Sequence, residues 1–468
     1  MPIVNMIGHE FTFPLADVLR LFYGECSRIS INQLSAGDDL GTIIYSRLSG
    51  GLVSTWIEGN TETLYCQDSA GKLPVKREVK RQLYHLLSNL LGCKYPWGSL
   101  TGIRPTVVAR EVKSAKELME KYFVREDKAA LAMETAAYED RVLQSASPDL
   151  FCGYIGVPFC RSRCSYCSFI SQDAASQLNL LVPYAEAVNN EIDTYCGENP
   201  PKLSCLYVGG GTPTVFDDDT FRKLLGRAFA ALRSEEIPEI TVEAGRPDTI
   251  TDHKLHTLKD LGVHRICINP QTLSDNTLAL LGRKHSVDDF YRAYDAARKI
   301  GFTTINTDLI AGLPEEKEED FIKSLEGVLS LEPENITVHT LSKKKKSSIA
   351  LDMHGLINRK EKDELDQMLK YADLRLKENG YMPYYLYKQK DSLGGHENTG
   401  YTKDGHACVY NVAMMSDQRS ILAFGAGSVS KRSFADRRLQ RCPNVRDVQE
   451  YMNRTVEMAK RKQTLFSV

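Results

Sequence analysis

Short apolar runs alternate with longer amphipathic stretches between residues 151 and 341. Three of these runs, YIGVP, CLYV and ITV, are almost continuously apolar, which is typical of parallel strands buried on both faces, and six runs in all are predicted strands. The six are Tyr154–Pro158, Cys205–Val208, Glu239–Glu243, Arg265–Asn269, Thr304–Ile310 and Asn335–Leu341. Between them the periodicity predicts helices, among them Pro183–Tyr195, with its proline in the first turn, and Lys317–Leu329. This alternation predicts an α/β fold of repeated βα units around a parallel sheet.

Polar residues stand at the carboxyl ends of several predicted strands. Glu243, Gln271 and Asp308 each follow or end an apolar run. In βα folds this edge of the sheet carries the ligands. We therefore treat these three residues as candidates for a site.

The first 150 residues have a different pattern. Strand-like runs broken by glycine and asparagine occupy residues 40–66, and one or two helices are predicted within Ala115–Leu143. An amphipathic helix is predicted at Lys76–Leu91. Its apolar stripe consists of Leu83, Leu86, Leu87, Leu90 and Leu91. We interpret residues 1–150 as a small α+β domain whose sequence indicates no chemistry.

After residue 342 the chain has a lysine run at 343–346, which we interpret as a solvated loop, with a phosphate or carboxylate clamp as the alternative. A helix at Asn358–Lys377, an aromatic strand at residues 381–390 and a small apolar segment at 421–431 follow. The chain is thus expected to have three domains, at 1–150, 151–341 and 342–468.

Composition excludes several classes of protein. The 468 residues include 59 Lys and Arg against 61 Asp and Glu, so no overall positive field favours nucleic acid as a partner. No apolar run reaches the roughly 18 residues that span a bilayer, and the first 20 residues lack the pattern of a signal peptide. We predict a soluble, cytoplasmic protein without a membrane span.

Twelve cysteines are too few for a disulfide scaffold in a chain of this length. Nine of them are scattered and are best interpreted as small buried hydrophobic residues. These nine are Cys26, Cys66, Cys93, Cys152, Cys196, Cys205, Cys267, Cys408 and Cys442. The other three, Cys160, Cys164 and Cys167, lie close together and need another explanation.

The spacing C-x3-C-x2-C places three thiolates on one tight loop without a histidine. Structural zinc sites prefer four protein ligands, whereas a cubane [4Fe–4S] cluster held by three cysteines keeps one iron open to a small molecule. The loop directly follows the first predicted strand of the parallel sheet. A second motif, GGGTPT at 209–214, follows the next strand. It is either a plain tight turn or a turn that presents backbone N–H groups to an anionic ligand.

Seven motifs in order resemble the radical S-adenosylmethionine (SAM) superfamily, and within it the oxygen-independent coproporphyrinogen III oxidase (HemN-like) family. They are YIGVPFCRSRCSYCSF, LYVGGGTPT, ITVEAGRPDTI, LGVHRICINPQTL, LGRKH, INTDLIAGLP and GAGSVS. The segments TGIRPT, PYYLYKQK and ENTGY, with an N-terminal extension of this length, most resemble the HemZ branch of that family.

The resemblance implies a partial (βα)6 TIM-like barrel with an N-terminal α+β domain and a C-terminal α+β extension. It implies a [4Fe–4S] cluster and one or two molecules of SAM as cofactors. Cys160, Cys164 and Cys167 would ligate the cluster that generates the radical. The residues that would contact SAM are Tyr154, Gly210, Gly211, Thr212, Glu243, Gln271, Arg283 and Asp308.

The implied reaction is oxidative decarboxylation of the propionates of coproporphyrinogen III to vinyl groups, giving protoporphyrinogen IX without oxygen. The cluster would take electrons from a flavodoxin- or ferredoxin-type donor and cleave SAM reductively. Cations are then expected near the mouth of the pocket, and Arg246, Arg265 and the lysines at 343–346 are candidates. Two other functions are open: a radical SAM enzyme that methylates or opens haem, and a haem chaperone that does not turn its ligand over.

Three positions depart from the family pattern. Gly156 stands where many members have histidine, the segment Glu243–Pro247 replaces a common Glu-x-Asn-Pro, and Phe169 stands where some oxidases have another cysteine. None of these changes removes a cluster cysteine. They concern two expectations, namely which substrate is bound and whether a second SAM molecule binds.

Overall fold

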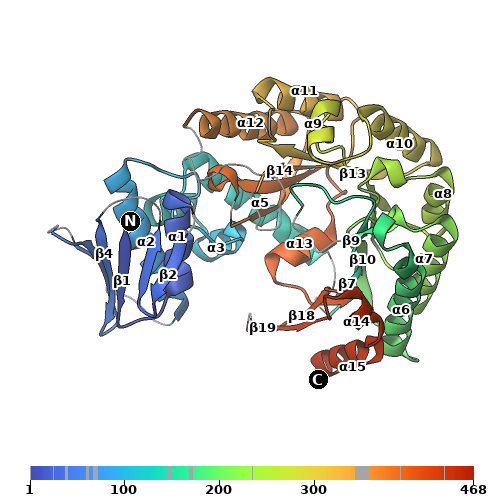
Figure 1. Cartoon of the computed structure of the whole chain (residues 1–468), viewed down its shortest axis with the longest axis horizontal. Helices are drawn as coiled ribbons and strands as arrows, with labels where there is room; N and C mark the ends of the chain where they lie inside the picture. Colours follow the sequence, from blue (N-terminus) through green and yellow to red (C-terminus); the bar gives the residue numbers. More distant parts are fainter. Residues whose placement is uncertain are drawn as a thin grey trace. The chain divides into compact units, whose positions relative to one another are not determined.

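The computed structural model describes residues 2–24, 26–36, 41–59, 63–66, 72–145, 147, 149–167, 172–233, 236–342, 359–390, 392–436 and 438–467. The lysine run at 343–346 and Phe169 lie outside these residues. The chain divides into two compact units (Figure 1). Unit 1 comprises Met1–Ala136, Ala350–Leu365 and Leu386–Asn398, and unit 2 comprises Ala137–Ile349, Asp366–Tyr385 and Thr399–Val468. The assignment of three domains by role stays a prediction.

Unit 1 is built on a six-stranded sheet in the order β2-β3-β1-β4-β5-β6. The strands are β1 (Ile3–Ile7), β2 (Cys26–Ser30), β3 (Gln33–Ala36), β4 (Ile43–Ser49), β5 (Leu52–Ile57) and β6 (Thr63–Cys66). Strands β1 and β4 are parallel, and the other neighbours are antiparallel. The helices are α1 (Thr12–Tyr23), α2 (Lys72–Leu91), α3 (Pro105–Val112), α4 (Ala115–Tyr122) and α5 (Glu126–Gln144), of which α5 continues into unit 2. The predicted α+β character of this region is confirmed.

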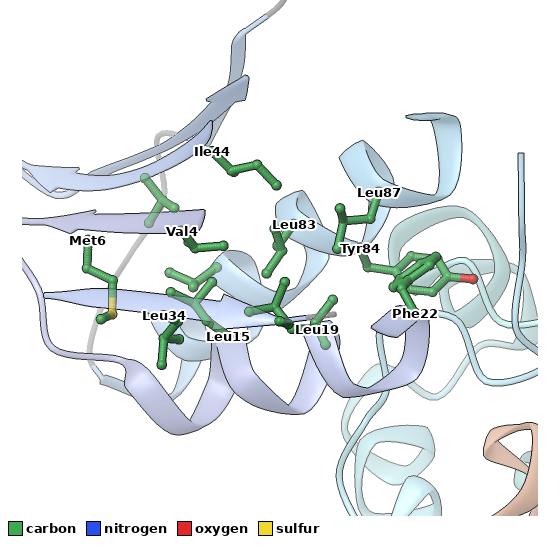
Figure 2. Packing of buried hydrophobic residues seen from close by; sticks show 14 of the residues in the cluster. Val4, Met6, Leu15, Leu19, Phe22, Leu34, Ile44, Leu83, Tyr84 and Leu87 are labelled. Carbon is green, nitrogen blue, oxygen red and sulfur yellow. The ribbon is translucent and has the colours of Figure 1, made fainter. Parts of the chain in front are cut away.

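The core of unit 1 lies between this sheet and the helices α1 and α2. Val4 and Ile44 from the sheet meet Leu15 and Leu19 from α1 and Leu83 from α2, and all five side chains are fully buried (Figure 2). The predicted stripe on α2 is shorter than expected, because Leu90 and Leu91 in its last turn are 46% and 42% exposed.

Unit 2 contains the six predicted strands, all parallel and in the order β14-β13-β12-β11-β10-β7. Their bounds are β7 (Phe151–Val157), β10 (Leu203–Gly210), β11 (Ile240–Glu243), β12 (Arg265–Cys267), β13 (Thr304–Ala311) and β14 (Asn335–Thr340). The intervening helices are α6 (Leu178–Cys196), α7 (Asp218–Leu232), α8 (Asp252–Asp260), α9 (Asp275–Leu280), α10 (Val287–Ile300) and α11 (Glu318–Leu329). Figure 1 shows these helices along one side of the strands, which form an incomplete (βα)6 barrel.

The remaining elements extend this sheet at both ends. Strand β16 (Glu397–Thr402) pairs antiparallel with β14, and β17 (Ile421–Phe424) pairs parallel with β7. Beyond them lie β15 (Met382–Lys388) at one edge and β18 (Val429–Ser433) with β19 (Leu439–Pro443) at the other. The helices of this part are α12 (Arg359–Glu378), α13 (Val409–Ser416), α14 (Val448–Met452) and α15 (Thr455–Phe466).

One predicted boundary is wrong. Helix α6 begins at Leu178, so Pro183 lies inside the helix instead of in its first turn. Proline lacks the N–H that would bond to the preceding turn, and the helix therefore gives up one internal hydrogen bond there. Among the described residues no helix is both long enough and apolar enough to cross a membrane.

Candidate active site

The cysteine loop, residues 160–167, starts directly after the first barrel strand. Cys160 ends the two-residue strand β8 (Phe159–Cys160), and the loop turns tightly where the Cys167 N–H donates to the Cys164 carbonyl at 3.1 Å. All three thiols are half-buried. The sequence predicted that this loop follows the carboxyl end of the first barrel strand, and the structure confirms that position.

The chemistry of the cysteine loop fits an iron–sulfur cluster. Among the described residues no three His, Cys, Asp or Glu side chains are grouped so that they could hold one ion. In a cubane cluster each cysteine binds a different iron, so the three sulfur atoms need not converge on a single point. Three half-buried cysteines on one loop are therefore a suitable ligand set for the cluster.

The glycine turn, residues 209–214, packs against the strand that leads into the cysteine loop. The backbone N–H groups of Gly211 and Thr212 donate to the carbonyls of Val157 and Phe159, both at 2.7 Å, and the N–H of Gly210 donates to Glu243 Oε2 at 3.2 Å. Each of these three N–H groups has an acceptor in the protein, which favours the plain tight turn over the turn that presents N–H groups to an anionic ligand. The Thr212 hydroxyl lies 3.5 Å from Cys160 Sγ and joins the turn to the loop.

Glycine is required in this turn by its geometry. Gly210 has a positive φ of 105°, which side chains rarely adopt, and a Cβ on Gly211 would lie 2.4 Å from the Phe159 carbonyl oxygen. The turn thus brings the ends of β7 and β10 close together beside the cysteines.

Glu243 ends β11 and faces the tyrosines of the neighbouring strands. The Tyr207 hydroxyl donates to Glu243 Oε1 at 2.7 Å, and the ring of Tyr410 stacks on those of both Tyr207 and Tyr154, with centroids 4.6 and 5.4 Å apart. Burial among these rings, together with the negative charge of Asp308, raises the pKa of Glu243 to about 7. Tyr154, which the sequence predicted, thus lies beside Glu243, and its own pKa is raised by burial and by that carboxylate.

Asp308 is held by one amide side chain from its own strand, β13, and by another from the segment that follows β12. Asn269 donates to its Oδ2 and Asn306 to its Oδ1, both at 2.8 Å, and His339 Nε2 lies 3.5 Å from Oδ2. Asn306 and Asp308 are two residues apart on β13 and so share one face of the sheet. The interior of the barrel therefore presents an oriented carboxylate.

Gln271 lies next to Asp308 in an unusual backbone conformation. Its φ is +71°, and its backbone bridges to β13 through bonds with the Asp308 carbonyl and the Ile310 N–H, at 2.9 and 3.0 Å. A non-glycine residue in the left-handed region costs about 1–3 kcal/mol and is often found at functional sites. The bridge holds Gln271 at the same edge as Glu243 and Asp308.

Two of the three candidate arginines lie at the cysteine loop, and the third lies at the opposite end of the strands. Arg283 contacts the cysteine loop, where it donates to the Tyr166 hydroxyl at 3.2 Å. Arg265 lies at the amino ends of the strands, paired with Glu239 at 3.1 Å and with Asn335 at 2.9 Å. Its proposed place near a pocket mouth at the carboxyl edge is wrong. Arg246 is 3% exposed and likewise turns toward the cysteine loop.

Several residues of this site were not predicted. Tyr207, Tyr410, Asn269, Asn306 and His339 surround the two carboxylates. The alternation along β13 could have indicated Asn306, because it shares a face with Asp308. The tyrosine contacts follow from pairing between segments far apart in the sequence, and no local pattern marks them.

Comparison with known proteins identifies the family. A model described as the radical SAM superfamily matches residues 154–327. The oxygen-independent coproporphyrinogen-III oxidase-like protein HemZ of Bacillus subtilis (strain 168) is 34% identical over 94% of this chain and 92% of its own length. The chain belongs to the HemZ family of radical SAM proteins. As in that superfamily, its cofactors are a [4Fe–4S] cluster and SAM.

Two further proteins are similar to this chain. The heme chaperone HemW of Bacillus subtilis (strain 168) is 30% identical over 59% of this chain and 69% of its own length. The solved structure of coproporphyrinogen III oxidase (HemN) from Escherichia coli aligns with a TM-score of 0.51 and 20% identity, over 69% of this chain and 73% of that one. This structural likeness confirms the predicted barrel fold.

Proposed function

We propose that this chain is a radical SAM enzyme that acts on a tetrapyrrole and oxidatively decarboxylates propionate side chains of coproporphyrinogen III to vinyl groups. The observation that carries the proposal is the convergence of the cysteine loop, Glu243 and Asp308 at one edge of the barrel. Support comes from the likeness to HemZ, which extends over 94% of this chain.

In this proposal Cys160, Cys164 and Cys167 hold the cluster. When bound there, the cluster would supply the electron for reductive cleavage of SAM, and a flavodoxin- or ferredoxin-type protein would deliver that electron. The three cysteines leave one coordination position open, where SAM binds. The loop fixes this position at the end of β7, beside the glycine turn.

The carboxylates then orient SAM. Glu243 accepts from the SAM amine, and Asp308 accepts from the ribose hydroxyls, because a carboxylate offers only acceptor oxygens. Gln271 and Tyr154 contact SAM from the same edge, as do Gly210, Gly211 and Thr212 through their carbonyl oxygens or the Thr212 side chain. Arg283 holds the cysteine loop toward SAM.

For each propionate, a hydrogen atom would pass from the carbon β to the carboxylate to the 5′-deoxyadenosyl group derived from SAM. Carbon dioxide would then leave with cleavage of the C–C bond, and one electron would pass to an external electron acceptor, which leaves a vinyl group. The described barrel residues must exclude water from the radical while this happens. The stacked rings of Tyr154, Tyr207 and Tyr410 provide an apolar wall for that purpose.

A haem chaperone is the second candidate, and the likeness to HemW favours it. Under that function the chain binds haem and leaves it unchanged. A radical SAM enzyme that methylates or opens haem would instead change the mass of haem.

One experiment distinguishes these functions. The reconstituted protein is incubated without oxygen with SAM, a reductant and either coproporphyrinogen III or haem, and the tetrapyrrole is analysed by mass spectrometry. We expect loss of carboxyl groups from coproporphyrinogen III and unchanged haem. Unchanged coproporphyrinogen III alongside a stable haem complex would support the chaperone, and modified haem would support the methylating or ring-opening enzyme.

A further inference from the structure

Two buried guanidinium groups converge on the middle cysteine of the loop. Arg246 Nη1 lies 3.8 Å and Arg283 Nη1 lies 3.9 Å from Cys164 Sγ. They approach from different elements, since Arg246 follows β11 and Arg283 follows α9. Cys164 therefore faces two positive charges at hydrogen-bonding distance for sulfur.

Arg246 is hydrogen-bonded to the cysteine loop on the amino side of Cys164. Its guanidinium donates to the Ser162 carbonyl at 3.2 Å and to the Ser162 hydroxyl at 3.2 and 3.1 Å. Its Nε pairs with Asp248 at 3.2 Å. At 3% exposure this side chain is not part of a solvated face.

Arg283 is hydrogen-bonded to the cysteine loop on the carboxyl side of Cys164. It donates to the Tyr166 hydroxyl at 3.2 Å and, through Nη2, to the carbonyls of Gly245 and Asn269 at 2.8 and 2.7 Å. The side chain is 6% exposed. The two arginines thus hold the residues on both sides of Cys164.

Around Cys164 the arginine side chains outnumber the carboxylate groups that pair with them. Within the described part of the chain Arg283 has no carboxylate partner, and Arg246 shares Asp248 with Arg161, whose Nε lies 3.5 Å from that carboxylate. Burial and the charges of Arg283 and Arg246 lower the pKa of His285 to about 3, so the histidine adds no charge. Buried charges need a partner, and the group that both arginines face is the sulfur of Cys164, which would bind the proposed cluster as a thiolate.

We propose that Arg246 is a positioning residue of the cluster, which donates with Arg283 to the Cys164 thiolate and raises the reduction potential of the cluster. The inference rests on the proposed role of the three cysteines. Reduction adds negative charge to the cluster, and hydrogen bonds and positive charge at a cluster sulfur stabilise the reduced form. Arg246 belongs to the segment Glu243–Pro247, which stands where many members of the family have Glu-x-Asn-Pro.

The test is the midpoint potential of the reconstituted cluster in Arg246→Gln, followed by electron paramagnetic resonance during a redox titration. We expect a more negative midpoint, with the ratio of reduced to oxidised cluster at a fixed potential about tenfold lower, which is about 59 mV for one electron. Arg161→Gln is the matched control, because this arginine pairs with the same Asp248 but is 53% exposed. We expect the parent potential for the control.

An unchanged midpoint in Arg246→Gln, at the iron content of the parent protein, would overturn the inference. If Arg246→Gln does not retain a cluster, Arg246→Lys decides the matter, since lysine keeps the charge but cannot reach Ser162 and Cys164 together. We expect a midpoint more negative than that of the parent for Arg246→Lys, and a midpoint equal to that of the parent would contradict the role. Failure of the parent protein itself to bind iron would instead refute the proposed function.

Discussion

The carboxyl group of Glu243 sits among tyrosine rings, with Asp308 as the nearest negative charge that raises its pKa. The bonds from Tyr207 and from the Gly210 N–H favour the ionised form but do not outweigh burial, and the pKa stands at about 7 instead of the ordinary 4.5. A bound SAM amine would add a positive charge beside this group. Binding is therefore coupled to loss of a proton from Glu243.

This coupling predicts that SAM affinity rises as the pH rises through about 7 and then levels off, because above that pH the proton has already left. In Glu243→Gln the affinity is lower and its pH dependence across this range disappears. Calorimetric titrations at several pH values measure both. An unchanged pH profile in the variant would refute the contact.

The same shift affects stability in the opposite direction. Between pH 4.5 and about 7 the folded state holds the proton more tightly than the unfolded state, so stability falls as the pH rises through this window. Glu243→Gln should flatten that part of the stability profile in the protein without SAM.

Asp308 offers a second prediction at this scale. Asp308→Ala removes an acceptor from the ribose hydroxyls, which should cost about 1.5–3 kcal/mol of binding and so about ten- to a hundredfold in SAM affinity. It also leaves the amides of Asn269 and Asn306 without their acceptor and should lower the melting temperature. Asn306→Ala is the control, because it removes one donor to Asp308 and keeps the carboxylate. If both variants lose stability and neither loses affinity, Asp308 has a structural role only.

The sequence predicted Glu243 at the end of its strand, and it ends β11. The predicted place of Asp308 at a strand end is wrong, because β13 continues to Ala311 and Asp308 lies within it. The sequence did not predict what surrounds them. The hydrogen bond from Tyr207 to Glu243 and the approach of Arg246 to Cys164 join residues 36 and 82 positions apart, and strand pairing creates both contacts. A local pattern carries no information on such neighbours.

At the scale of elements, prediction succeeded where burial on both faces makes a strand apolar throughout. All six predicted barrel strands are present, in chain order and parallel. Strand β17 was not assigned, because its four residues run directly into glycines, and only its parallel pairing with β7 makes it part of the sheet. The prediction also missed the start of α6 at Leu178, because proline usually stands in the first turn of a helix. Here tertiary packing keeps a helical turn before Pro183 that the proline alone disfavours.

Helix α15 is attached to α6 by a buried ion pair, which gives a prediction for stability. Lys462 pairs with Glu191, and both side chains are fully buried. Glu191 also accepts from the Tyr451 hydroxyl at 2.6 Å and from the Gly425 N–H at 2.9 Å, and so connects α6 to α14 and to the loop after β17. Removing one partner of a buried pair leaves an uncompensated charge.

Lys462→Met should therefore lower the free energy of unfolding by about 3–5 kcal/mol, measured by denaturant titration. The matched control is Lys460→Met, an exposed position on the same helix that should stay within about 0.5 kcal/mol of the parent. A loss below about 1 kcal/mol for Lys462→Met would show that the donors Tyr451, Gly425 and Asn444 suffice to balance Glu191.

At the scale of the whole molecule, the chain combines a sheet-and-helix unit with its own core and a barrel unit with the candidate site. The pattern of apolar runs and helical periodicity predicted both architectures, and the order of the motifs supported the barrel. The role of residues 1–150 stays open, since neither their pattern nor the described contacts within unit 1 indicate a reaction. The proposed chemistry is confined to side chains of unit 2.

The central claim is that Cys160, Cys164 and Cys167 hold a [4Fe–4S] cluster at the end of the first barrel strand. The most direct test is the iron and sulfide content of the anaerobically reconstituted protein, compared with a variant in which all three cysteines are alanine. The account predicts about four irons and four sulfides per chain in the parent and essentially none in the variant. A variant that retains the iron and sulfide of the parent would contradict it.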